Sequence, residues 1–268
     1  MFADSTTNMK KAIQTFSIII LLSAVSWISP EKKTAAIYQL TVYQYKDSLQ
    51  AAVLDQYLDK ALLPALHQLK YAQVGVFRSR ANDTAVVKKL YVLVAGKSLD
   101  EFARLNDRLN ALSGYLENGK AYLNASYKNP PYLRMETIYL KAFPLAPSLS
   151  LPHLNGPRAE RVYELRSYES ATEKIFKNKV RMFNEGDEIG IFSRLNFNAI
   201  FYSEVVAGSK MPNLMYMTSF ENMADRDAHW KKFGADSAWK KLSGMEEYKN
   251  NVSHIDITFL QPAHYSDY

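Results

Sequence analysis

The stretch Tyr38-Gln-Leu-Thr-Val-Tyr43 recurs as Tyr163-Glu-Leu-Arg-Ser-Tyr168, 125 residues further along the chain. At the same spacing, Leu90-Tyr-Val-Leu-Val is matched in type by Met215-Tyr-Met-Thr-Ser, which sets Tyr91 against Tyr216. A repeat at one spacing constrains a fold more strongly than local propensity does. The sequence therefore predicts two copies of one structural unit.

The first copy has the pattern of a βαββαβ unit. Residues 37–45, rich in β-branched and aromatic side chains, predict a strand, and Ser48 then precedes the apolar positions of a helix. Pro64 predicts a kink or a new turn in that helix because it has no N–H to donate. The remaining elements are expected as strands at 73–77 and 89–95, a helix from Ser98, and a strand at 136–140.

The second copy repeats this order after a linker rich in proline, residues 143–157. Its expected strands are 161–168, 199–206, 214–220 and 254–260, and its expected helices are 171–184, 187–195, 223–233 and a short one at Trp239. Two open antiparallel sheets, each with helices on one face, can bury their other faces against each other. The predicted fold class is α+β, with tandem ferredoxin-like βαββαβ domains at 36–145 and 158–262 packed as a pseudo-dimeric α/β barrel.

The N-terminal 26 residues have the order of a secretory signal peptide. Lys10 and Lys11 precede a mostly apolar run, residues 12–25, that ends in small residues. The apolar centre, 16–25, is shorter than the roughly 20 residues that a membrane-spanning helix needs. We therefore expect an exported, periplasmic protein with no stable membrane span once residues 1–26 are removed.

Composition and motifs exclude several classes of protein. The 268 residues include no cysteine, which excludes disulfides, thiolate metal sites and a cysteine nucleophile. The formal net charge of +6 is modest and does not indicate nucleic-acid binding. HExxH, GxxxxGK, GxGxxG and GxSxG motifs are absent, and the five histidines lack metal-ligand spacing. No metal site, hydrolase, NTPase or dehydrogenase is expected.

Three stretches of the second copy resemble the NIPSNAP family. They are Val162-Tyr-Glu-Leu-Arg-Ser-Tyr, Ser219-Phe-Glu-Asn-Met-Ala-Asp-Arg-Asp-Ala-His-Trp and Phe233-Gly-Ala-Asp-Ser-Ala-Trp239-Lys. The first copy is more divergent and lacks counterparts of Trp230 and Trp239. The resemblance implies a fold of the dimeric α/β-barrel superfamily, in a family whose eukaryotic members are associated with mitochondria and vesicular traffic. It implies no particular reaction.

Alternation along strand 161–168 puts Glu164, Arg166 and Tyr168 on one face. We expect this polar face to point into the barrel, with Tyr163, Leu165 and Ser167 under the helices. An arginine fork, a carboxylate and a phenol could bind a small acidic or phenolic ligand. The alternative is structural, because a buried Glu164 and Arg166 would have to pair whether or not they bind a ligand.

The last strand, 254–260, adds His254 and Asp256 to this candidate ligand site. His254 beside Asp256 could act as an oriented base, or it could be a satisfied structural histidine. No cofactor is expected. His229, near Trp230, Phe233 and Trp239, is a weak haem candidate, since aromatic residues three apart on a helix are typical of packing onto a sheet.

These observations favour a non-catalytic module of the cell envelope that binds a small molecule or another envelope protein. The alternative is a cofactor-independent monooxygenase or isomerase acting on a small aromatic substrate in the inter-domain cavity, by analogy of fold alone. Because the duplication can complete the barrel internally, we expect a monomer with an internal pseudo-dimer, or a dimer.

Overall fold

A computed structural model describes residues 35–268, so the predicted signal segment lies outside the described residues. The first half contains β1 (Ile37–Tyr45), α1 (Ser48–Tyr57), the π-helical turn η1 (Leu58–Leu62), α2 (Leu63–Gln68), β2 (Val74–Ser79), the 3₁₀ turn η2 (Arg80–Asp83), β3 (Lys88–Gly96), α3 (Leu99–Ala103), α4 (Leu105–Asn110), α5 (Ser113–Asn118), α6 (Lys120–Leu123) and β4 (Arg134–Ala142). The second half contains β5 (Val162–Glu169), α7 (Glu173–Asn184), α8 (Glu188–Arg194), β6 (Ala199–Ala207), β7 (Asn213–Phe220), α9 (Met223–Ala235), α10 (Ser237–Gly244), η3 (Glu246–Tyr248) and β8 (His254–Pro262). The predicted elements are all present, with boundaries that differ by a few residues.

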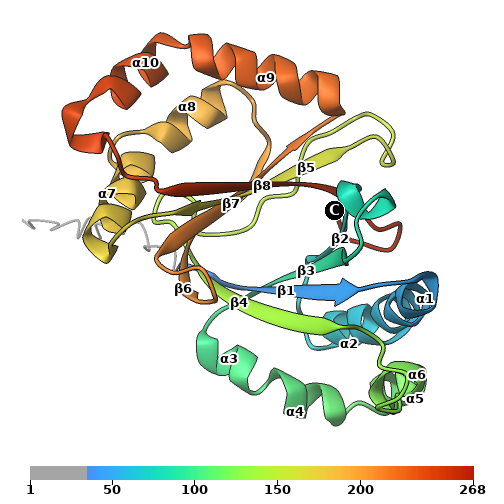
Figure 1. Ribbon diagram of the computed structural model, residues 1–268. Helices are drawn as coiled ribbons and strands as arrows, with labels where there is room; N and C mark the ends of the chain where they lie inside the picture. Colours follow the sequence, from blue (N-terminus) through green and yellow to red (C-terminus); the bar gives the residue numbers. More distant parts are fainter. Residues whose placement is uncertain (1–34) are drawn as a thin grey trace, which may run out of the picture. The chain divides into compact units, whose positions relative to one another are not determined.

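The eight strands form one closed antiparallel barrel in the order β1-β3-β2-β8-β5-β7-β6-β4. Helices α1–α6 lie outside it on one side and α7–α10 on the other (Figure 1). The two halves join by edge pairing, β2 with β8 and β4 with β6. Closure in this way leaves no unpaired sheet edge, which two stacked open sheets would have kept. None of the helices within residues 35–268 is long and apolar enough to cross a membrane.

Local chemistry explains where the helices begin. Asp47 rather than Ser48 caps α1, because its side chain accepts a hydrogen bond from the backbone N–H of Gln50. Ser98 caps α3 in the same way, as expected. Pro64 stands at the start of α2, directly after the π-helical turn, so the expected new turn is confirmed.

The two faces of β5 are the reverse of the prediction. Tyr163 and Leu165 belong to the apolar cluster inside the barrel, whereas Tyr168 belongs to the cluster under α7–α10. Glu164 and Arg166 also face those helices, where α9 supplies their partners. Alternation separates the faces of a strand, but it does not say which face the barrel encloses.

The same reversal holds in the first half, where Leu40 and Val42 face the interior and Tyr43 packs under the helices. Gln39 and Thr41 lie on the Tyr43 face and not in the barrel, as alternation along β1 requires. The barrel interior is therefore lined by the apolar faces of β1 and β5, whereas the sequence predicts their polar faces there.

The spacing of the repeat is one residue shorter between β3 and β7 than between β1 and β5. Leu40 pairs with Leu93, and its counterpart Leu165 pairs with Met217, so β3 and β7 are related by 124 residues. A one-residue shift moves a side chain to the other face of a sheet. The predicted equivalence of Tyr91 and Tyr216 is therefore wrong: Tyr91 points into the barrel and Tyr216 points toward the helices.

Candidate ligand site at the mouth of the barrel

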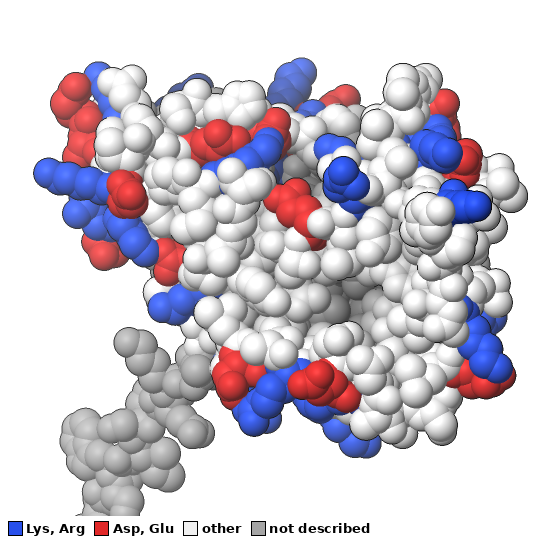
Figure 2. Space-filling model, turned by 60° about the horizontal axis from the view of Figure 1, so that its bottom comes forward, with Lys and Arg blue, Asp and Glu red and all other residues white. Residues whose placement is uncertain are grey.

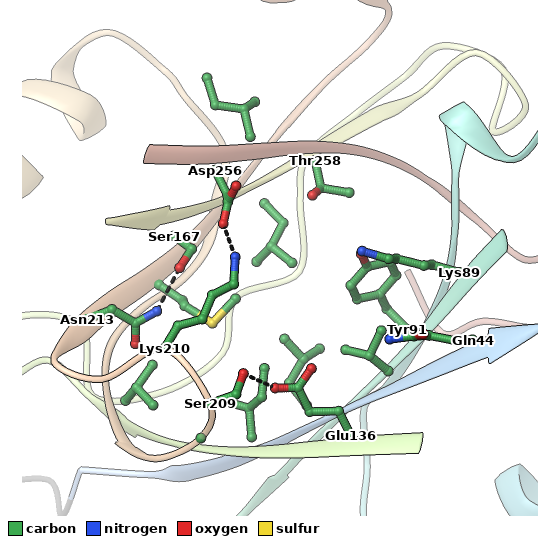
Figure 3. Close-up of a pocket in the computed structure, with 18 residues that line it drawn as sticks. Gln44, Lys89, Tyr91, Glu136, Ser167, Ser209, Lys210, Asn213, Asp256 and Thr258 are labelled. Carbon is green, nitrogen blue, oxygen red and sulfur yellow. Dashed lines mark hydrogen bonds and ion pairs between the residues drawn. The ribbon is translucent and has the colours of Figure 1, made fainter. Parts of the chain in front are cut away.

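One end of the barrel opens into a cavity of about 180 Å³, here called the mouth cavity (Figure 3). Seven of the eight strands contribute to it, together with the loop between β6 and β7. Its walls are apolar, with Val42, Ile138, Leu165 and Met215 among the lining residues. Polar and charged side chains surround this apolar interior, so the cavity has the composition of a small-molecule site.

Asn213 and Ser167 form a buried polar pair at one side of the mouth cavity. The Asn213 amide nitrogen donates to Ser167 Oγ over 2.6 Å, and Asn213 is only 2% exposed. Its Oδ1 is buried and accepts no hydrogen bond from any residue in 35–268. A buried acceptor without a donor costs about 1–3 kcal/mol, so this oxygen favours a ligand or water that can donate.

Lys210, from the loop after β6, lies beside two carboxylates at the rim. Its Nζ pairs with Asp256 and stands 3.7 Å from Glu169 Oε1. The hydrogen bond from Lys210 holds the pKa of Asp256 below its ordinary value, and the same bond raises the pKa of Lys210. Asp256 also contacts His254 Nε2 at 3.1 Å.

Glu169, His254 and Asp256 each place one potential metal-ligand atom within 4.8 Å of the others. The ammonium of Lys210 already pairs with both carboxylates of this cluster, offsets one of their two negative charges and would repel a cation. We therefore assign the group as an ion-pair network at the rim of the mouth cavity.

Lys89, Tyr91 and Glu136 lie across the cavity from Asn213 and Asp256 (Figure 3). Glu136 accepts a hydrogen bond from Ser209 Oγ at 2.5 Å. The Lys89 ammonium has no carboxylate within 4.0 Å in the described part of the chain. Burial raises the pKa of Tyr91 to about 12, so its phenol stays neutral at physiological pH. This side of the mouth therefore offers a cation without a partner.

Of the predicted site residues, only Asp256 lines the mouth cavity, and His254 contacts it from an exposed position at the rim. Glu164, Arg166 and Tyr168 lie on the other face of the sheet. Glu164 is fully buried and accepts four hydrogen bonds: from Arg166 Nε at 2.6 Å, from Arg226 Nε at 2.7 Å and Nη2 at 3.0 Å, and from Trp230 Nε1 at 2.8 Å.

Burial alone would raise the pKa of Glu164, but the bonds from Arg226, Arg166 and Trp230 outweigh it and hold this pKa below its ordinary value. Arg166 also donates to Tyr168 Oη at 3.0 Å and stacks 3.7 Å from the centroid of Trp230. All four acceptor positions of the carboxylate are therefore filled. The structural interpretation of the Glu164–Arg166 pair is the one that this geometry supports.

The aromatic signature of the second copy packs in the same layer. Trp230 lies against the sheet, where it contacts Glu164 and Arg166, and the rings of Phe233 and Trp239 follow with centroids 5.4 and 4.4 Å apart in succession. His229 Nδ1 is 2.8 Å from the carbonyl oxygen of Asp225, and its ring packs edge-on against Phe197. The packing expected from their helical spacing is confirmed, and haem binding by His229 stays a prediction.

Sequence reasoning missed Asn213, Lys210 and Lys89. Asn213 opens β7, and Lys210 stands in a loop where no periodicity applies. The sequence predicts Lys89 in a strand, but its place at the barrel mouth depends on how the sheet closes. The only available signal was the polar interruption of an otherwise apolar β5 face at Ser167.

The closed barrel, its two outer helix layers and the small mouth cavity define an α/β-barrel protein with an internal ligand-sized site. The NIPSNAP family model matches residues 163–267. The matched residues run from β5 to the C-terminal tail, so the resemblance of the second copy to the NIPSNAP family is confirmed. No curated protein sequence matches the chain.

Solved structures show the same fold in other proteins. A protein of Lactobacillus acidophilus NCFM, provisionally named a monooxygenase, is 11% identical, with 85% of this chain and 94% of that chain covered and a TM-score of 0.55. A protein of Fusobacterium nucleatum with a similar name is 7% identical, with 85% and 93% covered and a TM-score of 0.52. A NIPSNAP family protein of Agrobacterium tumefaciens is 19% identical, with 45% and 98% covered and a TM-score of 0.36. The likeness to the Lactobacillus and Fusobacterium proteins shows the fold alone, because the identities are so low.

Proposed function

We propose that the protein binds a small hydroxylated aromatic acid in the mouth cavity, without a covalent step. The observation that carries this proposal is the buried, unpaired Oδ1 of Asn213, because it calls for a donor from the ligand. Lys89, across the cavity, supplies a free cation for an anionic group. Between them, the apolar wall suits a ring.

The size of the mouth cavity agrees with a ligand of this class. A dry apolar cavity of about 150 Å³ is enough to bind benzene, and the mouth cavity measures about 180 Å³. One ring with short substituents therefore fits. The neutral phenol of Tyr91 adds a hydrogen-bonding group on the Lys89 side.

The test is titration of the purified protein with 4-hydroxybenzoate, followed by ligand-observed NMR. We expect saturable binding that weakens about tenfold in Lys89→Met and is lost in Val42→Phe, which fills the cavity. Lys97→Met, an exposed lysine without a carboxylate partner in the described chain, is the matched control and should bind as wild type does. Equal binding by all three variants would exclude the mouth cavity as the site.

A second candidate is a cofactor-independent monooxygenase or isomerase, favoured by the His254–Asp256 hydrogen bond of 3.1 Å at the rim. A carboxylate that orients an imidazole is the arrangement of a general base. Oxygen uptake or product formation from a bound hydroxy-aromatic acid would support this function. His254→Ala should then abolish turnover and leave affinity unchanged, whereas binding without turnover in wild type supports the non-catalytic function.

We further infer that the two halves are tandem ferredoxin-like units, because strand order β4-β1-β3-β2 in the first half matches β8-β5-β7-β6 in the second. Internal completion of the barrel predicts a monomer in solution, to be checked by light scattering; a tight obligate dimer would oppose it.

A Soret band on addition of haem, lost in His229→Ala, would instead support haem handling.

The N-terminal segment leads us to propose export to the periplasm, where the ligand or a partner protein of the envelope would be met. Cell fractionation and N-terminal sequencing of the mature protein test this. A new N-terminus near residue 27 in the periplasmic fraction is expected, and an uncleaved chain in the cytoplasmic fraction would refute export.

A further inference from the structure

A second cavity, here called the outer cavity, lies in the first half between the outer face of the sheet and the helices that cover it. Its volume is about 360 Å³, inside the range of about 300–1,000 Å³ typical of ligand pockets. Strands β1, β3 and β4 form one wall, and α2 and α4–α6 contribute to the other. The face that carries α3–α6 is hollowed, and uncharged residues surround the hollow (Figure 2).

The same layer of the second half is filled by charged side chains on the sheet. Glu164 and Arg166 occupy it, and the spacing of 125 between β1 and β5 makes Gln39 and Thr41 their counterparts. A carboxylate and a guanidinium are thus replaced by an amide and a short hydroxyl side chain. Both Gln39 and Thr41 line the outer cavity.

The helices that cover the first half also contribute a smaller side chain to this layer than those of the second half. Trp230, which stacks on Arg166, stands eight residues after the N-cap Asn222 of α9. The eighth residue after Ser98, the N-cap of α3, is Asn106. Asn106 is exposed and lines the outer cavity. The position that Trp230 fills with an indole in the second half is therefore occupied by the smaller amide of Asn106 in the first half, at the edge of the outer cavity.

The remaining wall is apolar and uncharged, with six aromatic side chains among aliphatic ones. No Asp, Glu, Lys, Arg or His lines the outer cavity. Tyr57 and Tyr122 stack face to face at 3.7 Å, and Tyr57 Oη lies 3.0 Å from Tyr115 Oη. Burial raises the pKa of Tyr43 to about 12, so this phenol carries no charge at physiological pH. Aromatic walls of this kind suit a planar ring system.

Gln39 offers a free acceptor on the sheet side of the outer cavity. Gln39 Nε2 donates to Thr41 Oγ1 at 3.3 Å, but Gln39 Oε1 accepts no hydrogen bond from any residue in 35–268. An anionic ligand would be buried here without a cation, which is strongly unfavourable. The wall therefore selects against the acids that the mouth cavity suits.

We propose that the outer cavity is a second binding site, for a neutral aromatic molecule of about two fused rings that donates one hydrogen bond to Gln39 Oε1. Its volume is twice that of the mouth cavity, and about 150 Å³ accommodates one benzene ring. The site does not depend on the proposed function of the mouth cavity, because the two cavities lie on opposite faces of β1.

The test compares 2-naphthol with its charged analogue 2-naphthoate by ligand-observed NMR titration of the purified protein. We expect 2-naphthol to bind at least tenfold more tightly than 2-naphthoate. Asn106→Trp, which restores the indole of the second half, should weaken 2-naphthol binding at least tenfold. Asn110→Trp, exposed on the same helix and outside the cavity lining, is the matched control and should bind as wild type does.

Two further variants test the hydrogen bond to the ligand and distinguish the outer cavity from the mouth cavity. Gln39→Leu should weaken 2-naphthol binding about fivefold, the equivalent of about 1 kcal/mol for one hydrogen bond. Val42→Phe, which fills the mouth cavity, should leave 2-naphthol binding unchanged. Equal affinity for 2-naphthol and 2-naphthoate, full binding in Asn106→Trp, or no saturation of wild type would each overturn the proposal.

Discussion

Substitution of Glu164 by Gln is the sharpest test of the buried network under α9. The carboxylate is 0% exposed and receives two hydrogen bonds on each oxygen, from Arg166, Arg226 and Trp230. In the Glu164→Gln variant one of these oxygens is replaced by an amide nitrogen, which faces donors instead of accepting from them. Arg166, whose side chain is 11% exposed, then keeps a buried charge without a carboxylate.

The expected cost is about 3–5 kcal/mol, the range found when one partner of a buried ion pair is removed. Urea unfolding at pH 7 measures it, with Glu160→Gln as the control. Glu160 is exposed and forms no ion pair within the described residues, so this substitution should stay within about 0.5 kcal/mol of wild type.

The difference between wild type and Glu164→Gln also has a predicted pH dependence. The folded-state pKa of Glu164 lies below its ordinary value, so its stabilisation is present above the unfolded-state pKa of about 4.3 and is lost as pH falls through the folded-state pKa. The difference in unfolding free energy between wild type and Glu164→Gln should therefore be largest at pH 7 and should decrease in acid. A gap under about 1 kcal/mol at pH 7, or one that does not change in acid, would refute the role given to this network.

Two other predictions concern buried and rim ion pairs. Lys179 and Glu188 pair at 2.8 Å with side chains 6% and 3% exposed, so Lys179→Met should cost about 3–5 kcal/mol, and the Lys179→Met/Glu188→Leu double variant should recover most of it in urea unfolding. Because burial raises the pKa of Glu188, the single variant should lose further stability as pH rises through that pKa; a cost that does not depend on pH would contradict this. At the rim, Lys210→Met should raise the pKa of Asp256 toward its ordinary value, since the bond from Lys210 is the main cause of its depression. Carboxyl ¹³C NMR titration measures this shift, and an unchanged Asp256 would show that the contact is absent in solution.

Much of the fold could be predicted from local pattern. The sequence predicts β1 at its observed bounds, a helix that starts at Ser98 and a new turn at Pro64. These features depend on side-chain alternation, capping and the missing proline N–H, which are properties of a few neighbouring residues. The NIPSNAP signature around Trp230 was also readable, because its residues are close together in sequence.

The candidate site was predicted less well, for reasons of geometry. The sequence predicts Glu164 and Arg166 as a charged pair but on the wrong face, because alternation does not indicate which face a barrel encloses. The error in pairing Tyr91 with Tyr216 came from a one-residue change of register between β3 and β7. Only the hydrogen-bonded ladder reveals such a change.

Local sequence pattern predicts the order of strands and helices and the resemblance of the second half to the NIPSNAP family, since both depend on residues near one another along the chain. Tertiary structure alone decided that the edge strands pair into a closed barrel, that the interior is apolar, and that Asn213, Lys210 and Lys89 meet at its mouth. It also decided that the layer filled by Arg166 and Trp230 in one half is a cavity in the other. The physical reason is that closure and packing depend on contacts between residues far apart in sequence.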